Sequence, residues 1–290
     1  MKLYFLQSRR GPARPSPIVE ETMASLRRRG FHVEAGIAED QVVCPDTVSV
    51  EHDLYLVKTP TELSLSLAGS LHDQGARMLN PYPSTALVQD KIVVSRRLRA
   101  AGIPTPRSWI TGDLSLLRDV VEERPLIIKP HRGHREGAGA RVVRSPQELA
   151  AVPPPQGAVI IQEYIEGTGQ DLKTYVVGEE VFAVRKPYSA TSYLQLGTPW
   201  PVSEEVRRIA LGCGRVFGLG LFGVDMIESA DGPMVVDVNS YPGYKGIPNV
   251  APRIADYIAD YARGRRPLAL PAAPETAGSE LRQARARKFA

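Results

Sequence analysis

The chain has 290 residues, of which 43% are hydrophobic and 23% are charged, and this composition is typical of a folded globular protein. That length is enough for two domains or for one large α/β body. The N-terminal apolar run is too short for a signal peptide, and no segment approaches the length of a membrane span. Cys44 and Cys213 form neither a disulfide framework nor a metal motif. We therefore expect a cytoplasmic protein with no membrane partner.

The net charge of +4 is concentrated at the C-terminus. Residues 263–290 hold six arginines and one lysine against two glutamates, a charge of +5, so the rest of the chain carries −1. This Pro-, Ala- and Arg-rich segment predicts a disordered basic tail over residues 264–290. The near-neutral body argues against nucleic acid as a partner.

The first part of the chain alternates short apolar strands with helices, which predicts a parallel sheet. Strands are expected at residues 2–6, 31–35 and 53–57. Arg9 follows the first strand, at the edge where open α/β sheets bind ligands, although it could equally belong to a solvated basic loop. The third strand ends in Lys58.

A single helix that ends at Gly102 is expected next, with Ser84 or Thr85 as its N-cap. Lys91 falls on the apolar stripe of this helix, four residues after Leu87. A lysine on an apolar face is costly unless its stem lies along the surface or its ammonium group meets an anion. Both alternatives stay open at this point.

Residues 126–129 predict a strand that leads into a glycine-rich loop, and a further strand is expected at residues 141–143. Glycine backbone can approach a phosphate closely, and Lys129 would add positive charge at the end of the strand. The glycines of this loop are Gly133, Gly137 and Gly139. Their spacing matches neither a P-loop nor a dinucleotide fingerprint.

A buried strand is expected at residues 159–161, after which the segment Gln162, Glu163, Tyr164 and Ile165 leaves the sheet. Residues 172–177 and 181–185 then predict a hairpin around Gly178-Glu179-Glu180. Lys173 and Tyr175 share one strand face, as do Ala183 and Arg185.

The stretch LFGVDMIESADGPMVVDVNSYPGYKG, residues 221–246, predicts a second hairpin around an Asp-Gly turn. Asp225 and Asp237 lie six residues on either side of the turn centre and therefore face each other, and Asn239 shares that face. Facing carboxylates repel, and a bound divalent cation such as Mg²⁺ removes that cost. The alternative is two solvated aspartates on an exposed face.

These features occur in an order that resembles the ATP-grasp superfamily over residues 1–262. The resemblance implies an α/β (α+β ATP-grasp) fold with ATP clamped between two β-sheets. Its parts would be a parallel α/β domain at 1–83, a central lid at 84–165 and a C-terminal subdomain at 166–263.

The resemblance also implies roles for individual residues. Lys91 and Lys129 would hold the phosphates of ATP, and Asp171 would reach the ribose or the adenine side. The segment Gln162, Glu163, Tyr164 and Ile165 would contact the adenine, chiefly through the backbone of Glu163 and Ile165. Asp225, Asp237 and Asn239 would hold two Mg²⁺ ions, or Mn²⁺ in their place.

Two branches of the superfamily compete. QEYIEGTGQDLKTYVVGEEVFAVRK is similar to a segment of the RimK-like carboxylate–amine ligases, with Lys173 in place of their usual arginine. This chain departs from those ligases in two places. Where they have an Arg-x-Asn element, it has residues 187–192, PYSATS. Where they usually have Glu-x-Asn, it has Asp237-Val238-Asn239. The hairpin of residues 221–246 is also similar to that of inositol-trisphosphate kinases. In those kinases a lysine at the position of Lys173 contacts the substrate, and Lys58 and Gly243 of this chain also resemble their substrate contacts.

We expect an ATP-dependent ligase that forms an amide bond through an acyl phosphate, adding an amino acid such as glutamate to a small amine or a peptide acceptor. Lys173 and Arg185 would be catalytic, although Arg185 could instead form a structural ion pair. Lys58, Arg9, Gly243 and Tyr244 would line the substrate pocket, although Tyr244 could equally pack against the last helix. The alternatives are an inositol-phosphate-type kinase and a non-enzymatic protein that binds nucleic acid through its tail. Whether the chain forms a homo-oligomer stays open.

Overall fold

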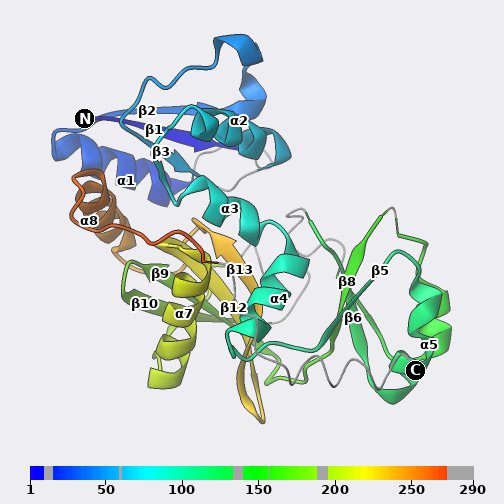
Figure 1. Ribbon diagram of the computed structural model, residues 1–290. Helices are drawn as coiled ribbons and strands as arrows, with labels where there is room; N and C mark the ends of the chain where they lie inside the picture. The colour runs from blue at the N-terminus through cyan, green and yellow to red at the C-terminus, as the bar shows by residue number, and fades with distance from the viewer. Residues whose placement is uncertain (10–15, 59–60, 133–139, 156, 188–194, 273–290) are drawn as a thin grey trace.

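The computed structural model of the chain describes residues 1–9, 16–58, 61–132, 140–155, 157–187 and 195–272. Three separate β-sheets follow one another along the chain (Figure 1). Among the described residues, no helix combines the length and the apolar character that a membrane crossing requires.

The first sheet is parallel, as expected, and has the strand order β2-β1-β3-β4. Its strands are β1 (Lys2–Gln7), β2 (His32–Ile37), β3 (Leu54–Val57) and β4 (Met78–Leu79). Two helices, α1 (Pro17–Arg28) and α2 (Glu62–Asp73), connect them, with the short 3₁₀ turns Ala38–Asp40 and Pro45–Thr47. The carboxyl ends of β1 and β3 therefore place Arg9 and Lys58 at one edge of the sheet.

The second sheet is antiparallel, with the order β5-β8-β6-β7. Its strands are β5 (Ser108–Thr111), β6 (Leu126–Pro130), β7 (Arg141–Val143) and β8 (Val159–Glu163). A 3₁₀ turn (Leu114–Leu117) and the helices α5 (Arg118–Glu123) and α6 (Pro146–Ala150) cover one face, where Ile128 and Ile161 are buried. Alternation along the strands puts Lys129 and Gln162 on the opposite face.

The third sheet has the order β11-β10-β9-β12-β13, and all of its pairs are antiparallel. Its strands are β9 (Gln170–Val177), β10 (Glu180–Pro187), β11 (Thr198–Trp200), β12 (Leu221–Ser229) and β13 (Gly232–Ser240). Helix α7 (Glu204–Phe217) packs on one face through Ile209 and Cys213, and the side chain of Ser203 caps this helix. Helix α8 (Val250–Ala262) lies on the other side, against α1.

The helix that we expected to run without interruption to Gly102 is two helices, α3 (Tyr82–Val88) and α4 (Lys91–Ala100). The break falls at Asp90, whose carboxylate accepts hydrogen bonds from the backbone N–H groups of Ile92 and Val93 and so caps α4. Lys91 is therefore the first residue of a helix. Val94 and Leu98 of α4 are buried in the core that α7 shares with the third sheet. The residue boundaries of the three expected parts stay a prediction.

Asn80 fastens the end of the first sheet to the start of β12. Its amide nitrogen donates to the carbonyl oxygen of Leu221 at 2.7 Å and to Oγ of Ser240 at 2.9 Å. Its amide oxygen accepts from the backbone N–H groups of Gly220 and Leu221. All hydrogen-bonding groups of this fully buried side chain are thus used in joining two parts of the chain.

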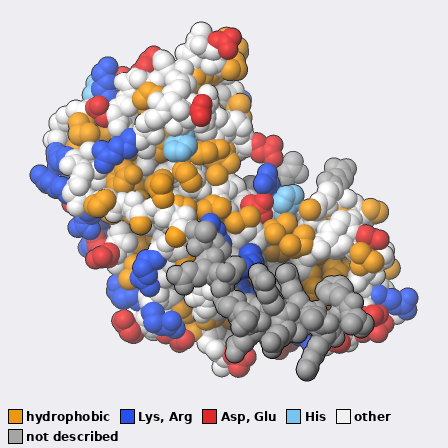
Figure 2. Space-filling model, in the orientation of Figure 1, with side chains coloured by type: hydrophobic (Ala, Val, Ile, Leu, Met, Phe, Trp, Pro, Cys, Tyr) orange, Lys and Arg blue, Asp and Glu red, His pale blue; other side chains and the backbone are white. Residues whose placement is uncertain are grey.

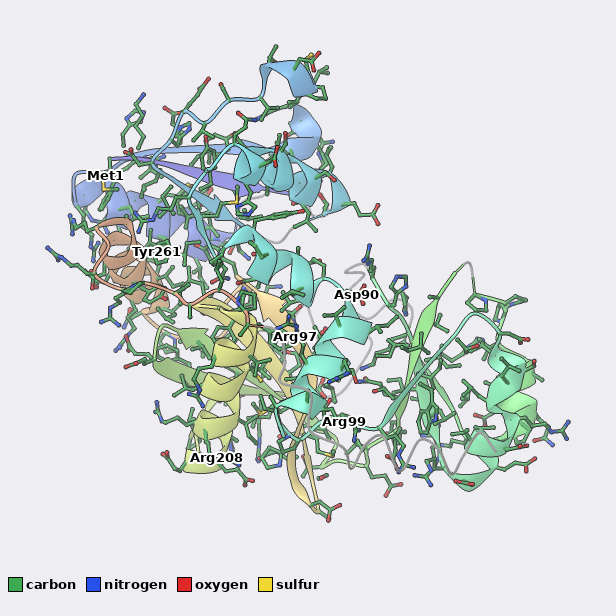
Figure 3. The ribbon with its side chains drawn as sticks, in the orientation of Figure 1. Met1, Asp90, Arg97, Arg99, Arg208 and Tyr261 are labelled. Carbon is green, nitrogen blue, oxygen red and sulfur yellow. The ribbon has the colours of Figure 1, made fainter. Side chains whose placement is uncertain are left out.

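The start of the expected disordered tail lies along the body. Arg97 on α4, labelled in Figure 3, donates to the carbonyl oxygen of Ala272 at 2.8 Å, and Leu268 packs against the core. Gly218 has a φ of +64°, and a Cβ atom there would come within 2.5 Å of the Ala269 carbonyl oxygen, so this close approach requires glycine. The expectation of disorder is therefore wrong for residues 264–272, and residues 273–290 lie outside the described residues.

Candidate active site

The two aspartates of the β12–β13 hairpin face each other. In the β12–β13 ladder Asp225 pairs with Asp237, and Gly223 pairs with Asn239, so the three polar side chains share one face as predicted. A bulge lies between this pair and the turn, and it leaves Val236 as an extra residue on β13. One carboxylate oxygen of Asp225, Oδ1, is buried and has no hydrogen-bond partner among the described residues.

Each of these carboxylates lies beside one lysine. Nζ of Lys91, at the start of α4, is 3.2 Å from Oδ2 of Asp237. Nζ of Lys173, on β9, is 3.2 Å from Oδ1 of Asp225, and the two residues are register partners. The negative charge of Asp225 raises the pKa of Lys173, so this ammonium group stays charged. Lys91 thus meets an anion, which answers the question left open by its place on the apolar stripe.

Lys129 brings the second sheet to the same site. Its ammonium group donates to Oε1 of Gln162 at 2.8 Å. Burial lowers the pKa of Lys129, while the charge of Asp237 opposes that shift and the charge of Lys91 adds to it. These mutual electrostatic effects mean that the lysines and aspartates of two sheets form one charged cluster.

Asp171 stands on the site face of β9. Burial raises its pKa to about 6, and the neighbouring charge of Asp225 adds to the effect. Its register partner on β10 is Lys186, so Lys186 lies on the site face as well. Lys186 is buried, and its ammonium group donates to the carbonyl oxygen of Gln195 at 2.7 Å. Sequence reasoning did not assign Lys186 to the site.

Arg185 does not face the site, and the expectation that it is catalytic is wrong. The β9–β10 turn has two residues rather than three, so Val177 pairs with Glu180 and Lys173 pairs with Val184. A shift of one residue moves a side chain to the other face of a sheet. Arg185 consequently lies on the α7 side of the sheet.

The surroundings of Arg185 are those of a structural residue. Its guanidinium group makes an ion pair of 2.6 Å with Glu228 and stacks on the ring of Trp200 at 3.5 Å. The alternative of a structural ion pair therefore describes this residue.

The segment expected to contact adenine leaves the second sheet at its edge. The backbone N–H of Glu163 donates to the carbonyl oxygen of Arg107, and that of Tyr164 donates to the carbonyl oxygen of Pro125. The Glu163 carboxylate pairs with Arg124 at 3.3 Å. Glu163, Tyr164 and Ile165 are partly exposed, whereas Gln162 is buried. Their contact with adenine stays a prediction.

Lys58 and Arg9, expected on the substrate side, already contact protein groups. The ammonium group of Lys58 is buried and donates to the carbonyl oxygen of Tyr241 at 2.7 Å, with the Tyr241 ring centre 5.1 Å away. Arg9 is ion-paired with Asp40, and its backbone N–H donates to Glu39. Gly243 is partly exposed in the loop after β13.

Tyr244 is a core residue, and the expectation that it lines the substrate pocket is wrong. Its side chain has no exposed surface, and its hydroxyl group donates to the carbonyl oxygen of Val176 at 2.8 Å. Its ring centre lies 5.4 Å from that of Tyr175, within the core that α8 completes. Packing against the last helix, the alternative that the sequence left open, is what the structure has.

The donor set of the hairpin fits Mg²⁺. Two facing carboxylates and an amide oxygen are hard ligands, and Oδ1 of Asp225 is buried beside the ammonium group of Lys173. No cluster of three or more His, Cys, Asp or Glu side chains suited to a metal occurs in the described part of the chain. Such a sparse set is usual where substrate phosphates complete the coordination of Mg²⁺.

Two expected features lie outside the described residues: the loop glycines Gly133, Gly137 and Gly139, and residues 188–192 of the segment that replaces the Arg-x-Asn element.

On the face drawn in Figure 2, Lys and Arg side chains are interspersed with Asp and Glu side chains rather than gathered in one basic field.

Comparison with known proteins shows which proteins this chain resembles. The family model described as the RimK-like ATP-grasp domain matches residues 88–261. A probable alpha-L-glutamate ligase from Saccharophagus degradans is 30% identical over 209 residues, which are 65% of this chain and 69% of that relative.

Two solved structures share the fold. The crystal structure of a RimK domain ATP-grasp protein from Sphaerobacter thermophilus has a TM-score of 0.70 at 21% identity, and covers 89% of this chain and 100% of its own. The ATP-grasp ligase PsnB, complexed with a minimal precursor, Mg and ADP, has a TM-score of 0.64 at 19% identity over 92% of this chain and 97% of its own. The expected α/β ATP-grasp fold is thereby confirmed.

Proposed function

This chain belongs to the RimK-like ATP-grasp family, and from that premise we propose that it adds an amino acid such as glutamate to a small amine or a peptide acceptor. It is a ligase that uses ATP and Mg²⁺ to join a carboxylate to an amine through a C–N bond. Its family and relatives do not favour the inositol-phosphate kinase alternative, and they leave no support for a non-enzymatic role.

One observation carries the proposal for the site: the facing pair Asp225 and Asp237, each beside a lysine at 3.2 Å. These aspartates and Asn239 would hold two Mg²⁺ ions, or Mn²⁺ in their place. The bound MgATP supplies the phosphoryl group that converts the substrate carboxylate into an acyl phosphate.

The lysines would place and neutralise the phosphates. Lys91 and Lys129 approach the aspartates from α4 and from the second sheet, so we assign them to the phosphates of ATP. Lys173 and Lys186 lie on the same face of the third sheet, and we assign them to the reacting end. Fixed positive charge there would stabilise the charge that develops when the carboxylate attacks phosphorus.

The reaction would proceed in two steps. The carboxylate oxygen bonds to the γ-phosphorus, and ADP leaves. The amine nitrogen, once deprotonated, then attacks the acyl carbon, and inorganic phosphate leaves with the electron pair of the C–O bond. Lys173 and Lys186 would hold the phosphate oxygens through both steps.

Adenine and substrate would lie on either side of this cluster. We assign the adenine to the segment from Gln162 to Ile165 and the ribose side to Asp171. Lys58, which holds the Tyr241 backbone, would shape the loop that contains Gly243 on the substrate side, with Arg9 at the outer rim. The free thiols of Cys44 and Cys213 support a cytoplasmic location.

Phosphate release tests this proposal. We would measure inorganic phosphate from MgATP with a panel of amino acids and small carboxylates, each with and without amine and peptide acceptors, and use Asp237→Asn as the blank. Release that depends on glutamate or another amino acid and that is lost in the variant supports the proposal. Release that no carboxylate stimulates, or that Asp237→Asn retains in full, contradicts it.

A further inference from the structure

The ion pairs of the site bear on how the metal and the nucleotide bind. Lys173 pairs with Asp225, and Lys91 pairs with Asp237, both at 3.2 Å. These four side chains are those that the proposed function assigns to metals and phosphates. The inference below rests on that function.

Both ion pairs are shielded in part from water, so their charges act strongly on each other. The side chains of Lys173 and Asp225 are 29% and 27% exposed, and those of Lys91 and Asp237 are 17% and 22% exposed. Without these lysines, two carboxylates that are direct partners across a ladder would repel. In the free protein the lysines therefore do what a cation would do.

The contact to Asp225 involves a carboxylate oxygen that is itself buried. This oxygen, Oδ1, lies 3.2 Å from Nζ of Lys173. A metal ion that bonds to Oδ1 therefore displaces the ammonium group of Lys173 from it.

We propose that Lys91 and Lys173 are internal counterions that make metal binding and nucleotide binding depend on each other. A metal ion alone takes the carboxylates but leaves two ammonium groups beside a cation. A nucleotide alone takes the ammonium groups but leaves two carboxylates beside its phosphates. When both bind, metals pair with carboxylates and phosphates pair with ammonium groups, so every charge has a partner. Because linkage is reciprocal, each ligand should strengthen the other by the same factor.

Binding measurements without turnover test this coupling. We would titrate the full chain with Mn²⁺ alone and follow free Mn²⁺ by electron paramagnetic resonance. The non-hydrolysable analogue AMPPNP would then be titrated with and without Mn²⁺ by calorimetry. The variants are Lys173→Met and the charge-conserving Lys173→Arg. Lys2→Met is the matched control, because it removes one positive charge from an exposed position far from the site.

The inference predicts that Lys173→Met binds Mn²⁺ alone about tenfold more tightly than the wild-type protein does, since an opposite charge at this distance shifts such equilibria at least that much. AMPPNP should bind this variant more weakly in the presence of Mn²⁺, so the coupling factor falls. Lys173→Arg and Lys2→Met should both keep the wild-type coupling. If Lys173→Met does not fold, as judged by circular dichroism, Lys91→Met carries the same prediction through Asp237.

If the folded methionine variant binds Mn²⁺ as the wild-type protein does, or more weakly, the inference is overturned. The proposed function still stands in that case, provided that the wild-type protein binds AMPPNP in the presence of Mn²⁺. A wild-type protein that binds no AMPPNP even with Mn²⁺ overturns both.

Discussion

Two adjacent residues of β10 should separate catalysis from stability. Arg185 and Lys186 project to opposite faces of the third sheet, Arg185 toward α7 and Lys186 toward Asp171. We would replace each by methionine, which removes the same charge and keeps a similar length. Lys186→Met should then impair the reaction, and Arg185→Met should impair only the fold.

The magnitudes follow from the contacts. The Arg185–Glu228 ion pair is 2.6 Å long with side chains 23% and 26% exposed, and the guanidinium group also stacks on Trp200 at 3.5 Å. A partly exposed ion pair and a cation–π contact each stabilise by about 0.5–1 kcal/mol. Arg185→Met should therefore lower the free energy of unfolding by about 1–2 kcal/mol, which is about 2–3 °C in Tm for a chain of this length. Loss of a fixed charge at the phosphoryl group usually costs about 100-fold or more in rate, and we expect that loss in Lys186→Met.

Steady-state phosphate release and thermal unfolding decide between the two roles. We expect kcat/KM of Arg185→Met to stay within about threefold of the wild-type value, below the cost of losing one hydrogen bond to a charged group. Lys186→Met should lose kcat more than substrate affinity, and Lys186→Arg should recover part of it. If Arg185→Met lost activity as severely as Lys186→Met while remaining folded, the assignment of the two faces would be refuted.

Two further outcomes are expected from buried groups. Tyr244→Phe should lower the free energy of unfolding by about 1 kcal/mol, because the hydrogen bond to the carbonyl oxygen of Val176 is lost, and it should leave KM unchanged. A raised KM for the carboxylate substrate would show instead that Tyr244 lines the substrate pocket. The pKa of Asp171 is about 6 in the folded protein against 3.8 ordinarily, so its ionisation opposes folding. The contribution of Asp171 to stability should therefore fall as pH rises from about 4 to about 6 and then level off. Asp171→Asn should therefore be more stable than the wild-type protein at pH 7 and equal to it in stability near pH 4. Thermal unfolding measures this difference, and a difference in Tm that stays constant from pH 4 to pH 7 would contradict the shifted pKa.

Counting outward from a turn placed the two aspartates opposite each other. The count centred on Asp231 predicted that Asp225 and Asp237 are direct partners, because a turn fixes the register of both strands. The turn itself consists of Ala230 and Asp231, with Ser229 paired to Gly232, and the extra residue Val236 of the bulge restores the pairing that the count assumed.

The same method failed for β9 and β10, where the length of the turn was wrong by one residue. Gly178 adopts a φ of +63° and allows a two-residue turn, so Glu180 belongs to the strand rather than to the turn. That single residue exchanged the faces of Arg185 and Lys186. Nothing in the alternation of apolar residues signals such a shift, because β10 packs apolar side chains on both faces, Val184 on one and Ala183 on the other.

Long-range packing was not accessible from the sequence. Tyr244 has the type and position of a pocket residue, but backbone φ values of +40° at Tyr241 and +50° at Tyr244 turn the loop back under α8.

The break between α3 and α4, by contrast, had a local signal in the sequence. Asp90 caps α4, and its short polar side chain followed by an apolar stripe could have located the break.

Oxygen transfer from the carboxylate to phosphate tests the central claim most directly. With a substrate found in the release panel, labelled with ¹⁸O in its carboxylate, we would analyse the inorganic phosphate by mass spectrometry. Attack of that carboxylate on the γ-phosphorus, followed by attack of the amine on the acyl carbon, predicts phosphate that carries one ¹⁸O atom. Phosphate released without label while amide product accumulates would contradict the acyl-phosphate route that we derive from the site.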